Sequence, residues 1–170
     1  MASAVSGARA VVNAVSLSVE HEQRIFQSVR VEAARRVAML ARRAGVETLV
    51  HISGIGADAR SASPYIRSRG RGEAAVFDAF PSARVIRPAV MFGPGDAFVT
   101  PLLTMLRHIP VFPMFGSGET RLQSTYVEDV AEAIVHVLRV PAVRQRYELA
   151  GPRVYTYQEL LRTICCQRGH

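Results

Sequence analysis

The feature that most constrains the fold is the alternation of short apolar runs with longer helical patterns along the chain. Short apolar runs suit buried strands, whereas apolar residues spaced by three and four suit one face of a helix. Regular alternation of the two indicates βα units and a parallel sheet. The sequence therefore predicts an α/β fold. Its expected strands are Ala8–Val15, Glu47–Ser53, Arg84–Pro88 and Arg146–Leu149.

Helices are expected between these strands. The first should cover Glu22–Ala44 and end at Gly45, a typical C-terminal cap residue. Ser63 and Pro64 suit the N-cap and first position of a second helix that runs to about Ala79. The expected stripe of the first helix is Phe26, Val29, Ala33, Val37, Leu40 and Ala44. The other expected helices are Phe98–Arg107 and two that open with the capping boxes Thr125-x-x-Glu128 and Thr156-x-x-Glu159.

Composition narrows the class of protein. A chain of 170 residues with 49% hydrophobic residues is long enough for one domain with a real core. All 21 basic residues are arginine, and they are scattered despite the net charge of +7, so nucleic acid is not an expected partner.

The adjacent Cys165 and Cys166 have no metal-ligand spacing. No apolar stretch reaches the ~18 residues of a transmembrane segment, so none is expected.

Tyr65 and Arg69 are the first candidates for chemistry. They are four residues apart at the start of the second expected helix, which places both on one face of it. A phenol beside a cation can exchange a proton with a substrate oxygen. Ser53, at the end of the preceding strand, adds a hydroxyl group. Tyrosine and arginine at this spacing also occur by chance, so the pair alone does not define a site.

Two further segments strengthen the interpretation. Tyr65-x-x-x-Arg69 resembles the Tyr-x-x-x-Lys segment of short-chain dehydrogenases. The segments 87–96 (Arg-Pro-x-x-x-Phe-Gly-Pro-Gly-Asp) and 123–131 (Gln-Ser-Thr-Tyr-Val-Glu-Asp-Val-Ala) resemble those of the extended members of that family, in the same order. The resemblance implies a doubly wound Rossmann fold with a small C-terminal region typical of extended members. It also implies that Tyr65 is the acid/base, Arg69 its electrostatic partner and Ser53 the group that orients substrate.

Other segments are similar to an atypical subgroup, the nucleotide-binding accessory subunit of respiratory complex I (the alpha-subcomplex subunit nine type) and its bacterial relatives. They are residues 11–13, 51–58, 64–68, 116–123 and 147–152. This resemblance implies a dinucleotide-binding fold, with NADP or NAD, in a protein that serves structure or assembly more than catalysis. It implies complex I subunits as partners and a cytoplasmic location, or a peripheral one on the inner face of a bacterial or mitochondrial respiratory membrane.

Three departures from the family pattern bear on function. The first expected strand corresponds to the fourth strand of the family, so residues 1–170 are expected to form a partial domain without the first βαβαβ half and its glycine loop. Gly54-Ile-Gly-Ala-Asp-Ala59 fits the G-x-G-x-x-A pattern, but no helix follows it directly, as a phosphate loop requires. Arg69 replaces lysine, and Gly54 falls where catalytic relatives have a hydroxyl residue.

These observations predict a non-catalytic protein of the accessory-subunit type, acting in assembly or remaining as a truncated remnant. The alternative is an active NAD(P)-dependent oxidoreductase or epimerase with vestigial or working Tyr65, Arg69 and Ser53. The expected cofactor contacts are Asn13, Ser53, Tyr65, Arg69, Pro88, Ala89 and Val90. Without a glycine loop, dinucleotide binding should be weak or lost. The apolar strand Ala8–Val15 should recruit a missing N-terminal half or a second copy through its exposed edge.

Overall fold

The computed structural model describes residues 5–16, 26–96, 98–108, 117–141 and 143–166. Their contacts form two compact units. Unit 1 comprises Met1–Pro88 and Ala133–Glu148, and unit 2 comprises Ala89–Glu132 and Leu149–His170. The candidate chemistry around Tyr65 and Arg69 therefore lies within unit 1.

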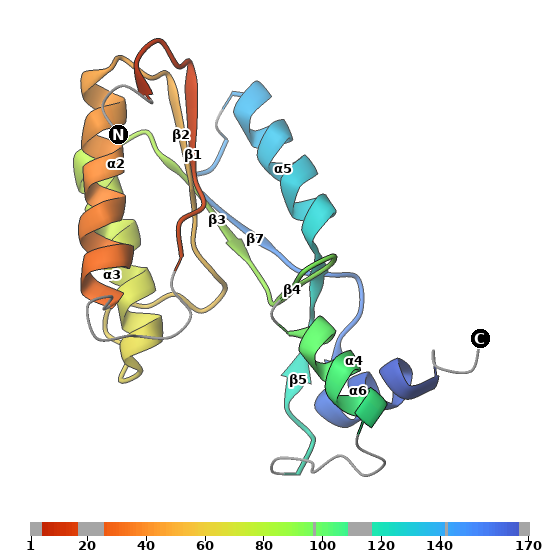
Figure 1. Ribbon diagram of the computed structural model, residues 1–170. Helices are drawn as coiled ribbons and strands as arrows, with labels where there is room; N and C mark the ends of the chain where they lie inside the picture. The colour runs from red at the N-terminus through yellow and green to blue at the C-terminus, as the bar shows by residue number, and fades with distance from the viewer. Residues whose placement is uncertain (1–4, 17–25, 97, 109–116, 142, 167–170) are drawn as a thin grey trace. The chain divides into compact units, whose positions relative to one another are not determined.

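A four-stranded parallel sheet organises the first unit (Figure 1). Its strands are β1 (Ala10–Asn13), β2 (Thr48–Ile52), β3 (Arg84–Pro88) and β7 (Arg146–Leu149), in the order β1-β2-β3-β7. The pairs β1–β2 and β2–β3 are parallel. Backbone bonds from Val85 to Gln145 and from Ala89 to Leu149 advance together, so β7 is parallel as well. All four predicted strands and the α/β class are confirmed, with β1 shorter at both ends.

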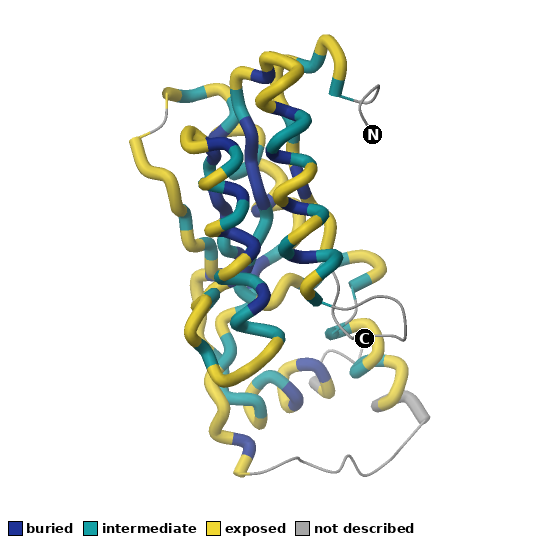
Figure 2. The backbone as a smooth tube through the Cα atoms, turned by 90° about the vertical axis from the view of Figure 1, so that its left-hand side faces the viewer, coloured by how far each residue is buried: buried dark blue, intermediate teal, exposed yellow. Residues whose placement is uncertain are grey.

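Helices η1 (Gln27–Glu32), α2 (Ala33–Arg43) and α3 (Pro64–Ala79) lie on one side of this sheet (Figure 1). The C-terminal part of α5 (Val127–Arg139) belongs to the same unit, and its Val137 carbonyl accepts from Arg84 of β3. Between α2, α3 and the sheet is a core of small and branched side chains, and the buried stretches follow the inner faces of these elements (Figure 2). The buried members are Ala34, Ala38, Ala41, Val46, Leu49, Val76, Phe80 and Ala83. The helix end predicted at Gly45 is confirmed, since Gly45 has a φ of +72°.

The predicted stripe of the first helix is wrong in its phase. The buried residues are Arg30, Ala34, Ala38 and Ala41, whereas Phe26, Val29, Ala33, Val37 and Leu40 are half-buried and Ala44 is exposed. The buried residues are themselves spaced by four, four and three, and the small alanines rather than the larger residues of the stripe enter the core between α2, α3 and the sheet. Residues 22–25 of the predicted helix lie outside the described residues.

Gly70 and Gly72 mark places where α3 meets its neighbours without room for a side chain. A Cβ on Gly72 would overlap the carbonyl oxygen of Arg30 in η1, and one on Gly70 would overlap the backbone of Ala59. Both glycines thus permit close packing of α3 against η1 and the loop after β2.

Gly72→Ala is therefore expected to lower the free energy of unfolding by about 1–2 kcal/mol. Helix propensity alone would raise it by ~1 kcal/mol, but overpacking against backbone costs ~1–3 kcal/mol. Urea unfolding of this variant and of Ala74→Gly, an exposed position in the same helix, measures both effects. Stabilisation by Gly72→Ala as large as the loss in Ala74→Gly would show that no close contact exists.

Unit 2 holds α4 (Val99–His108), α6 (Tyr157–Cys166) and four two-residue strands. Strand β4 (Met91–Phe92) pairs with β6 (Thr125–Tyr126), and β5 (Arg121–Leu122) pairs with β8 (Tyr155–Thr156). Leu161 and Ile164 of α6 are buried in its small core. The partly buried residues packed on them are Val99, Leu102, Leu103, Tyr157 and Leu160. None of the two-residue strands was predicted, because such short pairings leave no periodic signal.

The structure tests three predicted helix caps. Thr156 and Glu159 form the full capping box, in which Thr156 N donates to Glu159 Oε2 at 2.8 Å and Glu159 N to Thr156 Oγ1 at 3.1 Å. The box at Thr125 is wrong: Thr125 is buried in β6, where its N–H donates to the carbonyl of Val90. Ser63 precedes Pro64 as predicted but makes no side-chain capping bond.

Within the described ranges, no helix is long and apolar enough to cross a membrane.

Candidate functional site around Tyr65

The predicted pair of Tyr65 and Arg69 comes together on the first turns of α3. Arg69 Nη2 donates to the Tyr65 hydroxyl oxygen at 2.6 Å, and the Arg69 Cζ lies 4.6 Å from the centre of the Tyr65 ring. The four-residue spacing on a helix that begins at Pro64 explains this contact. Both side chains are half-buried, so the phenol and the guanidinium are desolvated in part. The structure thus brings together the two residues that the sequence singled out for proton chemistry.

Gly54 makes room for the Arg69 side chain. A Cβ on Gly54 would overlap Arg69 Nη1 and would lie 2.6 Å from its Cζ. The guanidinium therefore lies against the backbone that follows β2. Any residue with a side chain at position 54 would displace it. The arginine at position 69 can therefore adopt this position only because position 54 has no side chain.

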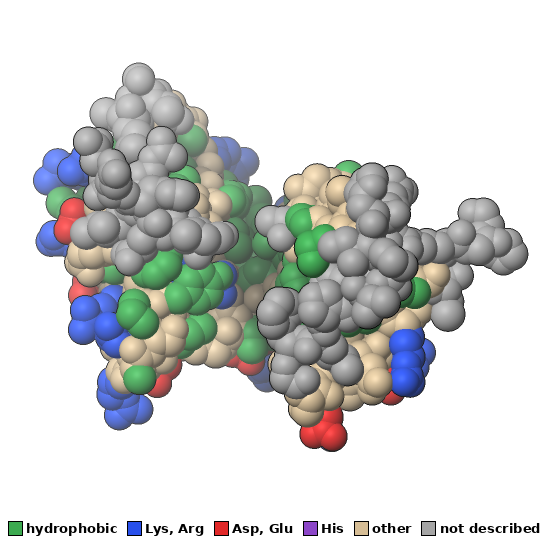
Figure 3. All heavy atoms as spheres, turned by 60° about the horizontal axis from the view of Figure 1, so that its bottom comes forward, with side chains coloured by type: hydrophobic (Ala, Val, Ile, Leu, Met, Phe, Trp, Pro, Cys, Tyr) green, Lys and Arg blue, Asp and Glu red, His purple; other side chains and the backbone are tan. Residues whose placement is uncertain are grey.

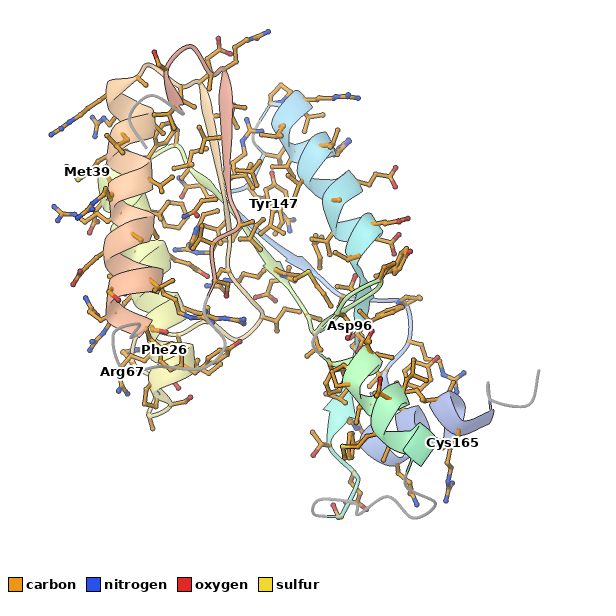
Figure 4. All side chains as sticks on the ribbon, viewed as in Figure 1. Phe26, Met39, Arg67, Asp96, Tyr147 and Cys165 are labelled. Carbon is orange, nitrogen blue, oxygen red and sulfur yellow. The ribbon has the colours of Figure 1, made fainter. Side chains whose placement is uncertain are left out.

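A second arginine, Arg30, reaches the same tyrosine and was missed by sequence reasoning. Its Cζ lies 4.5 Å from the centre of the Tyr65 ring and 5.5 Å from that of Phe26. Phe26 packs edge-on against Tyr65 with ring centres 5.6 Å apart, and Figure 4 labels Phe26 and Arg67 at the same end of the α2–α3 pair. Burial, and then the positive charge of Arg69, lower the pKa of Arg30, while Tyr65 opposes the shift.

Asn13, a predicted cofactor contact, is 5% exposed at the end of β1. Its Nδ2 lies 3.2 Å from Nδ1 of His51, its partner in the β1–β2 register, and its Oδ1 accepts from Val15 N. His51 is itself buried. Burial is the main reason that the pKa of His51 falls to about 4. Asn13 therefore holds a neutral histidine in the sheet.

The remaining predicted cofactor contacts follow the carboxyl ends of β2 and β3, where ligands bind in open parallel sheets. The Ser53 hydroxyl is buried and has no hydrogen-bond partner among the described residues. Pro88 accepts from Ile55 N, Ala89 N donates to Leu149, and Val90 accepts from Thr125 N. Pro88 is buried and belongs to unit 1, whereas Ala89 and Val90 belong to unit 2. Of the predicted site residues, Tyr65 and Arg69 lie together against the backbone at Gly54, just after the end of β2.

A buried ion network, also missed by sequence reasoning, holds α3 to the sheet. Glu73, whose side chain is 2% exposed, accepts two hydrogen bonds from Arg87 of β3, at 2.8 and 2.9 Å. Arg146 Nε of β7 lies 3.4 Å from the same carboxylate. Arg87 also contacts the exposed Glu148 at 3.1 Å. Hydrogen bonding to Glu73 is the main reason that the pKa of Arg87 is raised. This network fixes the helix that positions Tyr65 and Arg69.

Basic residues also line the outer surface of unit 1, away from Tyr65. A cavity of about 300 Å³ lies between α2 and α3, and its lining includes Arg35, Arg42, Arg43 and Asp78. Arginine side chains stand out along the outer edge of this unit in Figure 3. No group of three or more metal-ligating side chains occurs among the residues that the structure describes.

Residues 2–150 match the NAD dependent epimerase/dehydratase family. The chain belongs to this family. The predicted Rossmann fold of the short-chain dehydrogenase type is thereby confirmed.

Curated relatives narrow the comparison. The chain is 33% identical over 156 residues to NADH dehydrogenase [ubiquinone] 1 alpha subcomplex subunit 9 of Arabidopsis thaliana, covering 90% of this chain and 39% of that protein. It is 32% identical to the same subunit of Mus musculus, over 95% of this chain and 43% of that protein. It is also 34% identical to a ceramide reductase of Caulobacter vibrioides, over 92% and 49%. The chain thus spans less than half the length of these relatives. The predicted similarity to the complex I accessory subunit is confirmed.

Solved structures agree on the fold. MoeE5 in complex with UDP-glucuronic acid and NAD superimposes with a TM-score of 0.84 at 19% identity, covering 99% of this chain and 65% of that one. DesIV, a dTDP-glucose 4,6-dehydratase of Streptomyces venezuelae with NAD bound, gives 0.82 at 20% identity, over 99% and 60%. At this identity the likeness concerns the fold alone.

Proposed function

We propose that this chain is an NAD(P)-binding-fold protein of the complex I accessory-subunit type that serves assembly or interaction rather than catalysis. The observation that supports it best is the position of Arg69, which fills the space over Gly54 and donates to the Tyr65 hydroxyl. The phenol keeps its own proton, because Arg69 donates to its oxygen, but the guanidinium takes up the space beside the backbone at Gly54. No side-chain hydroxyl at position 54 can orient a substrate oxygen there. One positioned donor typically contributes ~10²–10³ in rate.

The second candidate is an active NAD(P)-dependent oxidoreductase or epimerase, which the similarity to a ceramide reductase favours. In that case Tyr65 is the acid/base, Arg69 its electrostatic partner and Ser53 the substrate-orienting group. Turnover separates the two candidates. The accessory-type protein leaves NADPH absorbance unchanged with carbonyl substrates, whereas an enzyme turns over and loses its activity in Tyr65→Phe.

NADP or NAD is the proposed cofactor. The Ser53 hydroxyl and Arg69 Nε are buried and have no hydrogen-bond partner among the described residues, and they fit the hydroxyl groups of a nicotinamide ribose. When bound, the dinucleotide supplies hydride chemistry. The adenosine half of the dinucleotide has fewer candidate contacts in the described residues. The Gly54–Ala59 loop does not lead directly into a helix, because α3 begins only at Pro64, so this loop presents no helix N-terminus to a pyrophosphate. The proposed contacts are Asn13, Ser53, Tyr65, Arg69, Pro88, Ala89 and Val90.

Dinucleotide binding to the 170-residue chain is expected to be weak, with a Kd well above micromolar, because pyrophosphate contacts supply much of a dinucleotide's affinity. Calorimetric titration with NADPH and NADH measures it. Ser53→Ala and Arg69→Met should weaken any residual binding further. Arg71→Met, an exposed position on the same helix, serves as the control. A micromolar or tighter Kd for NADPH would contradict the expectation.

The proposed partners are complex I subunits, an N-terminal half or a second copy of this chain, at the inner face of a respiratory membrane or in the cytoplasm. β1 supports the strand-pairing part of the proposal. Among the described strands it pairs with β2 alone, and Val12 on it is 40% exposed. Val15 just beyond it is 58% exposed. An apolar strand with one open edge is a template for another strand.

The chain is accordingly expected to elute as a dimer or larger species rather than as a stable monomer. Size-exclusion chromatography with light scattering measures the mass. Val12→Lys places a charge on the strand and should shift the population towards monomer. The matched control is Val143→Lys, at a position 87% exposed outside the sheet. A wild-type monomer that resists concentration and melts cooperatively would contradict this expectation.

A further inference from the structure

The cavity between α2 and the C-terminal end of α3 is lined mainly by basic side chains. It has a volume of about 300 Å³, and both helices belong to unit 1. Its described lining consists of Arg35, Met39, Arg42 and Arg43 of α2 with Asp78 and Ala79 of α3. This volume is at the lower end of the range of ligand pockets, so the cavity suits a small molecule or one group of a larger one.

The cavity-lining residues of α2 form one stripe along the helix. Arg35, Met39 and Arg42 are spaced by four and three residues, which places them on one face. Figure 4 labels Met39 on the side of α2 that is turned away from the sheet. The helix dipole accounts for basic residues in the last turn, but Arg35 lies about two turns earlier. The convergence of these side chains on the cavity is therefore more than a helix-end effect.

The three arginines keep most of their donors available. Arg42 Nη1 donates to the Ala79 carbonyl at 3.4 Å, which links the side chain to the end of α3. The side chains of Arg35 and Arg43 donate to no described residue, and the ion pairs of the described residues involve other arginines. Because each guanidinium carries five N–H donors, the cavity presents many donors and, in its described lining, one carboxylate, Asp78.

We propose that this cavity binds a phosphate group, carried by a small phosphate ester or by a lipid headgroup. Three arginines against one aspartate leave an excess of two positive charges. A phosphoryl group carries about −1.5 to −2 at pH 7 and balances that excess, whereas a carboxylate carries a single charge. A guanidinium also matches two phosphate oxygens at once. Met39 and Ala79 offer apolar contact to the organic part of the ligand. The site requires neither hydride transfer nor dinucleotide binding, so it goes beyond the proposed function.

The first arm of the test is calorimetric titration of the full chain with glycerol 3-phosphate, compared with acetate at equal ionic strength. Wild type should bind the phosphate ester more tightly than acetate. Arg35→Met and Arg42→Met should each weaken that binding by roughly 10-fold, the lower end for a hydrogen bond to a charged group, because both side chains are exposed. Arg36→Met is the matched control: it removes the same charge from an exposed position of α2 outside the cavity lining and should leave the affinity unchanged.

The second arm is co-sedimentation with phosphatidylcholine vesicles that contain phosphatidic acid, against phosphatidylcholine alone. Binding of glycerol 3-phosphate that is weakened in Arg35→Met supports a site for a soluble ester. Binding to the phosphatidic acid vesicles alone, with the same loss in Arg35→Met, supports a site for a lipid headgroup. Absence of binding in both arms would overturn the proposal, as would acetate binding as tight as that of the ester.

An equal loss of affinity in Arg36→Met would also overturn the proposal, because net charge alone would then attract the ligand. Asp78→Asn gives a variant that acts in the opposite direction. It removes the carboxylate of the lining and should tighten phosphate binding, whereas Glu47→Gln, at an exposed position outside the cavity, should not. Neither arm contains a dinucleotide, so a failure here is distinguishable from a failure of the proposed function.

Discussion

Replacing Glu73 with glutamine is expected to lower the free energy of unfolding by about 3–5 kcal/mol, the usual cost of breaking a buried ion pair from one side. The Glu73 side chain is 2% exposed and accepts two hydrogen bonds from Arg87, whose side chain is 18% exposed. Without the carboxylate, two guanidinium groups from β3 and β7 face each other across an uncharged amide. Glutamine has nearly the same size, so the loss reports the charge and its hydrogen bonds rather than a cavity.

Urea unfolding monitored by circular dichroism measures the effect of Glu73→Gln. Glu148→Gln is the matched control, because it removes a carboxylate from the same arginine at a side chain that is 55% exposed. Exposed ion pairs contribute ~0–1 kcal/mol, so this control should unfold nearly as wild type does. Equal effects of the two substitutions would show that Glu73 is not the centre of the network.

The second large effect is a loss of stability in acid caused by His51. Burial lowers its folded pKa from 6.5 to about 4, so the folded protein disfavours the protonated ring that the unfolded chain accepts. Its contribution to stability is therefore complete above pH 6.5 and is lost as the pH falls towards 4. The fall from 6.5 in the unfolded chain to about 4 in the folded protein corresponds to a contribution of roughly 3 kcal/mol to the free energy of unfolding. Protonation of Nδ1 also abolishes the acceptor that faces the Asn13 amide.

The measurement is the free energy of unfolding at several pH values between 7 and 4, in wild type and in His51→Gln. Glutamine still offers an acceptor to Asn13 but does not titrate. Carboxylates titrate in both proteins, so the difference between the two curves isolates the histidine. Wild type should lose roughly 3 kcal/mol more than the variant. Parallel curves would contradict the assignment of a buried neutral His51.

Regular elements could be predicted from the sequence because each carries its own signal. The four parallel strands are short apolar runs, and α3 begins at a proline and ends before β3 as its pattern indicates. Tyr65 and Arg69 were found because a helix places residues four apart on one face. The capping box of Thr156 and Glu159 formed because both partners are local. Thr125 did not form one, because pairing with β4 uses its backbone instead.

The ion network could not be predicted, because it depends on packing between elements far apart in the chain, whereas the burial of Arg30 had one local signal. The buried face holds Arg30 and the alanines after it, whereas Phe26 and Val29 are half-buried. One signal did exist: Ala34, Ala38 and Ala41 are spaced as one helix face, and Arg30 is four residues before them. Small residues on that face indicate close contact between helices. The position of Arg30 on the same face indicates that its side chain is buried as well.

The most direct test of a non-catalytic accessory-type protein is single-turnover absorbance at the NADPH band, with the full chain in excess and a panel of carbonyl substrates that includes long-chain ketones. Wild type should transfer no hydride, and Tyr65→Phe and Arg69→Lys should give the same flat trace. Hydride transfer by wild type that disappears in Tyr65→Phe would contradict the account and would identify Tyr65 as a working acid/base.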